Sequence, residues 1–81
     1  MRMFINKTPA GANNLCGASV ARFRKELRIS QRELADCLQL AGLDIDKNAI
    51  QRIEAGKRFV TDIELLALSR VLHKNLEELL K

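Results

Sequence analysis

Four side chains with hydrogen-bonding ends lie close together in the middle of the chain. They are Lys47, Asn48, Gln51 and Arg52. If this stretch is helical, a rotation of about 100° per residue places all four within an arc of about 140°. Asn and Gln amides can pair with adenine, and Arg and Lys can donate to O6 and N7 of guanine. The chemistry that this set favours is therefore the recognition of base edges in double-stranded DNA.

Such a helix needs an apolar face and defined ends. Ala49, Ile50 and Ile53 recur at helical spacing on the opposite side of the arc. Asp46 is a suitable N-cap, since its carboxylate can accept a backbone N–H of the first turn. Gly56 is a suitable residue after the last turn. We therefore predict a helix over residues 47–55 with its polar side exposed.

The stretch before it has the pattern of a supporting helix. Ser30 followed by Glu33 is a capping box, in which each side chain bonds the backbone of the other residue. The helix is expected to run to Leu40 or Ala41 and to stop at Gly42. The two helices together form a helix-turn-helix unit.

Three further helices are predicted, one before this unit and two after it. Val20, Phe23 and Leu27 indicate a helix from about residue 14 to 27 or 28. Thr61 with Glu64, and Asn75 with Glu78, are two more capping boxes, which begin helices over 62–72 and 75–80. Residues 1–13 have no helical period and are predicted to be a flexible or partly extended arm, with residues 14–81 as the folded domain. The fold class is all-α, a compact five-helix bundle.

Charge is distributed unevenly along the 81 residues. The net charge is +4, but residues 1–60 carry 11 Lys and Arg against 6 Asp and Glu, whereas residues 61–81 carry 3 against 4. A basic front favours a polyanionic partner, nucleic acid before membrane. On charge alone, a merely soluble basic domain is also consistent with the sequence.

The residues needed for other chemistry are sparse. Cys16 and Cys37 are expected to be reduced thiols in a cytoplasmic protein. The apolar centre at residues 3–5 is too short for a signal peptide, and no apolar run is long enough for a membrane span. His73 is the single histidine, and the sequence has no Gly-rich phosphate loop, nucleophile elbow or zinc spacing. We expect no enzymatic activity, no metal and no cofactor.

Residues 14–80 resemble the Cro/repressor-type helix-turn-helix family, the phage-repressor-like DNA-binding domains. The matching stretches are SQRELA at 30–35, IQRIEAGKR at 50–58 and, after Leu72, NLEEL at 75–79. The resemblance implies a five-helix bundle that regulates transcription at an operator, usually as a symmetric dimer on an inverted repeat.

The resemblance also implies roles for single residues. Gln31 would anchor a phosphate and support the reader helix, and Arg24 and Glu54 would form a structural ion pair. The positions that match the base-reading ones are Lys47, Asn48 and Arg52, with Gln51 adjacent. Lys57 and Arg58 follow the reader helix, where they would contact phosphates and add affinity without sequence information.

The chain departs from the family pattern in the turn between the two central helices. Residues 39–45 make this turn about five residues longer than expected. Leu40 and Leu43 are apolar, so we expect the inserted residues to pack against the domain. We also expect the helix that follows Ser30 to be longer by about a turn. His73 stands where relatives favour Gly, and we expect it to tolerate the left-handed conformation.

The sequence is compatible with two kinds of protein partner. The last two helices carry more apolar side chains than their inward face needs, namely Leu66, Val71 and Leu80. This excess indicates either a homodimer contact or a wider core. A different class of function is an antitoxin-like module that binds a protein partner through this surface or through the arm, with Phe4 and Ile5.

Overall fold

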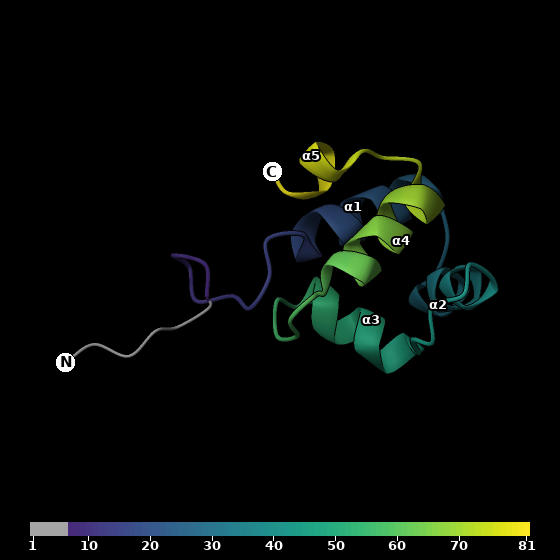
Figure 1. Ribbon diagram of the computed structural model, residues 1–81, viewed down its shortest axis with the longest axis horizontal. Helices are drawn as coiled ribbons and strands as arrows, with labels where there is room; N and C mark the ends of the chain where they lie inside the picture. The colour runs from purple at the N-terminus through teal and green to yellow at the C-terminus, as the bar shows by residue number, and fades with distance from the viewer. Residues whose placement is uncertain (1–6) are drawn as a thin grey trace.

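The computed structural model describes residues 7–81, and in that range it contains five helices and no strand. They are α1 (Gly17–Glu26), α2 (Gln31–Leu40), α3 (Lys47–Glu54), α4 (Asp62–Leu72) and α5 (Leu76–Leu79). Figure 1 shows α4 between α5 and α3, and α4 packs against α1. The predicted all-α, five-helix fold is confirmed.

Local capping determines where four of the five helices begin. Ser30, Thr61 and Asn75 each form a complete capping box with the glutamate three residues later. The Asp46 carboxylate accepts the Ala49 N–H at the start of α3. These caps satisfy backbone donors that a helix cannot pair internally. The four predicted starts are therefore confirmed.

The core is built from aliphatic side chains of all five helices and one phenylalanine. Its most deeply buried members, at 0–1% exposure, are Val20, Leu34, Leu38, Ile50, Ile53, Leu68, Leu72 and Leu79. They come from the inward stripe of each helix, as helical periodicity requires. The helix α3 packs against both α1 and α2, so it is supported on two sides.

The first helix begins later than predicted, at Gly17 instead of near Asn14. The Asn14 side chain accepts the Gly17 N–H at 2.8 Å, and its amide nitrogen is bonded to residues of another segment. Residues 14–16 are therefore held in an irregular conformation that leads into the helix.

The longer turn between α2 and α3 packs only in part. Gly42 takes a φ of 95° and ends α2, as expected. Ile45 is buried and Leu43 packs against the core, but Leu40 is 90% exposed. The expectation that Leu40 packs is wrong, because it lies on the outer face of the last turn of α2. His73 does adopt the left-handed conformation, with φ 56° and ψ 41°.

The part of the arm within the described residues forms a turn that is attached to the domain. Thr8 and Ala12 are joined by two hydrogen bonds, and the Asn13 N–H donates to the Gly56 carbonyl. Phe4 and Ile5 lie outside the described residues.

Candidate nucleic-acid interface

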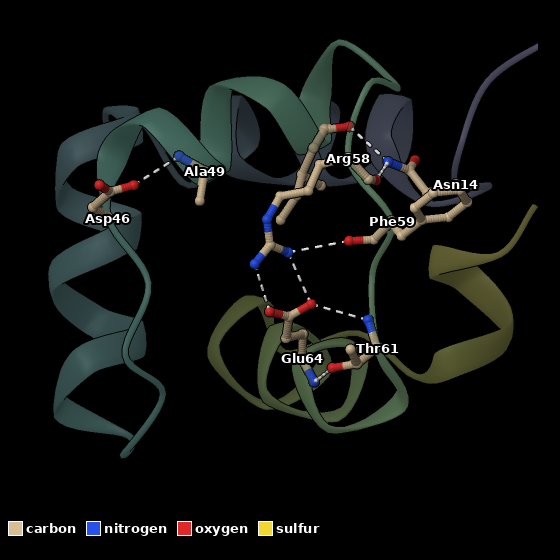
Figure 2. A network of polar contacts seen from close by, with 8 residues as sticks. Asn14, Asp46, Ala49, Arg58, Phe59, Thr61 and Glu64 are labelled. Atoms are coloured by element: carbon tan, nitrogen blue, oxygen red, sulfur yellow. Dashed lines mark hydrogen bonds and ion pairs between the residues drawn. The ribbon is translucent and has the colours of Figure 1, made fainter.

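The outward face of α3 carries the candidate base-reading residues. All four side chains are exposed: Lys47, Asn48, Gln51 and Arg52. On the opposite face, Ile50 and Ile53 are fully buried. The cap from Asp46 to Ala49, 2.8 Å long, fixes the first turn, as Figure 2 shows. The sequence prediction of a single exposed polar arc is confirmed.

The N-terminal end of α3 is positioned by the turn before it. Ile45 is buried, and the Gln39 side chain on α2 donates to its carbonyl oxygen at 2.9 Å. Beside this bond, an open polar cleft of about 400 Å³ lies between α2 and the start of α3. It is lined by Arg32, Ala35, Asp36, Gln39, Asp46, Lys47 and Asn48. The start of the reader helix therefore borders a recess with both basic and acidic side chains.

The C-terminal end of α3 is held by a polar cluster around Glu54. The Arg24 guanidinium donates to both carboxylate oxygens, at 2.7 and 3.0 Å, and also to the Ile29 carbonyl. Gln31, at the start of α2, donates to the same carboxylate at 3.0 Å. The hydrogen bond with Glu54 raises the pKa of Arg24 above its ordinary value. One carboxylate thus joins α1, α2 and α3, and Gln31 supports the reader helix directly.

Lys57 and Arg58 follow α3 but have different surroundings. Lys57 is exposed, whereas Arg58 makes a bidentate ion pair with Glu64, in which each guanidinium nitrogen lies 2.9 Å from a carboxylate oxygen. Arg58 also donates to the Phe59 carbonyl, and Glu64 completes the capping box with Thr61 (Figure 2). The hydrogen bond from Arg58 lowers the pKa of Glu64. In this conformation Arg58 links the loop to α4, and Lys57 is the better placed of the two for a phosphate.

A comparison with known families agrees with this geometry. The model of the helix-turn-helix family HTH_3, the XRE-type or Cro/C1-like family, matches residues 20–79. The chain belongs to this family. No curated protein and no solved structure matches it. Because the match covers the reader helix and its supports, the chain is an XRE-type DNA-binding helix-turn-helix protein.

Sequence reasoning missed several residues of this XRE-type domain. Arg32 lines the cleft beside the start of α3, and a basic residue one position after Gln31 was the available signal. Asn13 and Asn14 bond the loop that follows α3, across 39 to 44 residues of sequence. No local pattern could have indicated those bonds.

The three candidate dimer residues do not share one helix face. Leu66 and Leu80 are each 42% exposed, whereas Val71 is half-buried and packs against the core. Leu66 and Val71 are five residues apart on α4, which corresponds to about 140° around the helix. A flat contact through α4 would therefore involve Leu66 more than Val71.

The two cysteines differ in exposure. Cys16 is buried, and burial raises the pKa of its thiol, whereas Cys37 is exposed. Within residues 7–81 no three His, Cys, Asp or Glu side chains gather as metal ligands would. None of the helices in that range has the length and hydropathy needed to span a bilayer.

Proposed function

We propose that this protein is a transcriptional repressor that places α3 in the major groove of an operator. The observation that carries the proposal is the face of α3: four exposed polar side chains opposite two fully buried isoleucines. The major groove, about 12 Å wide, admits one helix, and these residue types match the donors and acceptors of base edges. Repression requires only that the bound protein occupies the site.

Phosphate contacts come from the flanks of the reader helix. Lys57 is exposed directly after α3, and Gln31 lies at the N-terminus of α2. Backbone N–H groups at helix starts favour anions, so the same region suits a phosphate. Arg58 would add its charge only if its pairing with Glu64 were exchanged for a phosphate. These contacts supply affinity and register, while α3 supplies sequence preference.

The functional unit that we propose is a homodimer on an inverted repeat. The exposed leucines Leu66 and Leu80 are candidate contacts, with Val71 at their margin. A two-fold arrangement would place two reader helices about 34–36 Å apart, one helical turn of DNA. Light scattering on the purified protein measures its molar mass and therefore its oligomeric state. An antitoxin-like role would appear instead as a stable complex with a different protein.

A DNA selection experiment tests the reading function. The purified chain is used to select duplexes from a randomised pool. Its affinity for the selected duplexes is then compared with its affinity for an unselected duplex of equal length. Arg52→Ala should lower the preference for the selected duplex, because it removes a base contact worth ~1–3 kcal/mol. Lys57→Ala should weaken binding to both duplexes alike and flatten the salt dependence by ~1 in slope. If Arg52→Ala leaves the preference intact, the base-reading assignment is wrong.

A further inference from the structure

We infer that Asn14, which lies before the first helix and outside the matched family region, is a positioning residue for DNA reading. Its side chain fixes the C-terminal end of the reader helix and the loop that follows. The inference rests on the proposed function, since it concerns the geometry of the same site. It makes the described residues just before α1 part of the reading machinery.

Asn14 makes three hydrogen bonds that join three segments. Its Oδ1 accepts the Gly17 N–H at 2.8 Å, at the start of α1. Its Nδ2 donates to the Ile53 carbonyl at 3.1 Å and to the Arg58 carbonyl at 2.8 Å. Figure 2 shows the Asn14 amide directed at the Arg58 carbonyl. One amide therefore donates to a carbonyl in the last turn of α3, which also accepts the Gly56 N–H, and to a second carbonyl in the following loop.

Neighbouring contacts reinforce this attachment. The Asn13 N–H donates to the Gly56 carbonyl at 2.8 Å, and its side chain donates to the Lys57 carbonyl at 2.9 Å. Gly17 lies so close to the Ile53 carbonyl that a Cβ atom would collide with it. The carbonyls of residues 53, 56, 57 and 58 thus all receive a donor from Asn13 or Asn14. The backbone that carries Lys57 is held from the arm side.

The geometry of α3 makes this end important for reading. Its eight residues span ~12 Å at 1.5 Å per residue. A tilt of ~10° about the C-terminal end would move the side chains at the N-terminal end by ~2 Å. Hydrogen bonds to bases tolerate only a few tenths of an ångström. Loss of the attachment should therefore reduce sequence preference more than it reduces general affinity for DNA.

The substitution Asn14→Asp separates the two roles of the side chain. Aspartate keeps an oxygen that accepts the Gly17 N–H, so the start of α1 is retained. It replaces the donor with an oxygen that repels the carbonyls of Ile53 and Arg58. Asn14→Ser is a second variant, which keeps a capping oxygen but is too short to reach the loop. Ala10→Asp, at an exposed position of the same segment, controls for the added negative charge.

The readout is the ratio of affinities for the selected and the unselected duplex, measured well below the unfolding temperature. We expect Asn14→Asp and Asn14→Ser to lower this ratio by about tenfold, roughly the loss of one base contact. Ala10→Asp should weaken binding to both duplexes and keep the ratio. If Asn14 had only a structural role, its substitution would lower the unfolding temperature and leave the affinity ratio unchanged. A ratio equal to that of the wild type in both Asn14 variants overturns the inference.

The outcome for the wild type distinguishes this inference from the proposed function. If the unmodified chain selects no duplex, the proposed function fails, and hydrogen exchange then decides the structural part. The Gly56 and Lys57 amides bond to α3 carbonyls and should exchange faster in Asn14→Asp. Unchanged exchange at both amides would overturn the positioning role as well.

Discussion

The two ends of the reader helix are held by different kinds of contact. At the C-terminal end, Arg24 and Gln31 bind the Glu54 carboxylate, and Asn14 binds the Ile53 carbonyl. The N-terminal end depends on the buried Ile45 side chain, a single cap and one bond from Gln39. Directional polar contacts therefore concentrate at one end, and burial of apolar surface holds the other.

This difference indicates which end acts as the fixed point. Charge-assisted and bidentate hydrogen bonds add geometric specificity, so they fix the orientation of the helix end that they hold. Lys47 and Asn48 project from the opposite end, next to the longer turn. If α3 reads DNA as proposed, the polar contacts at its C-terminal end would hold its orientation independently of that turn.

The largest expected effect is loss of the Glu54 cluster. Arg24→Ala leaves a carboxylate whose side chain is only 8% exposed without its cationic partner. Breaking a buried pair in this way costs about 3–5 kcal/mol in free energy of unfolding. Urea denaturation monitored by circular dichroism measures it. Lys25→Ala, which removes an exposed charge from the same helix, should stay within about 0.5 kcal/mol. A cost for Arg24→Ala below about 1 kcal/mol would show that the polar cluster does not hold this end.

A smaller effect is expected at the loop beyond the same end, and it depends on pH. The bond from Arg58 lowers the pKa of Glu64, so between the folded and unfolded pKa values the unfolded chain binds more protons. Stability from this pair is present above about pH 4.3 and is lost as the pH falls through the folded pKa. Glu64→Gln keeps the capping box but should cost about 1 kcal/mol at pH 7.

The comparison of wild type and Glu64→Gln isolates this contribution from other carboxylates. The difference in free energy of unfolding between the two proteins should shrink as the pH is lowered from 6 to about 3. A difference that is constant over this range would mean that the Arg58 pair does not contribute to the stability of the loop.

The features that the sequence predicts correctly depend on residues that lie close together in the chain. The caps at Ser30, Asp46, Thr61 and Asn75 depend on a residue three positions later, and the polar arc of α3 depends only on helical rotation. The start of α1 was misplaced because its capping atom belongs to Asn14, whose amide is committed to residues 53 and 58. Contacts of that range depend on how the finished helices pack.

Charge pairing shows the same limit within the candidate site. Sequence spacing suggested that Lys57 and Arg58 are equivalent phosphate contacts. The loop geometry instead directs Arg58 to Glu64, which also caps α4, and leaves Lys57 exposed. Six residues separate the partners, but no regular element connects them, so neither helical nor strand periodicity could indicate their pairing.

The smallest expected effect is that of substituting Leu40, in the longer turn at the other end. Leu40 is 90% exposed and Leu43 packs on the core, so the two leucines should respond differently. Leu40→Gln should change the free energy of unfolding by less than about 0.5 kcal/mol. Leu43→Ala should cost about 1–2 kcal/mol, below the ~2–5 kcal/mol of a fully buried leucine. If Leu40→Gln proved as costly as Leu43→Ala, Leu40 would be covered in solution. Dependence of that cost on protein concentration would then identify the cover as a second copy of the chain.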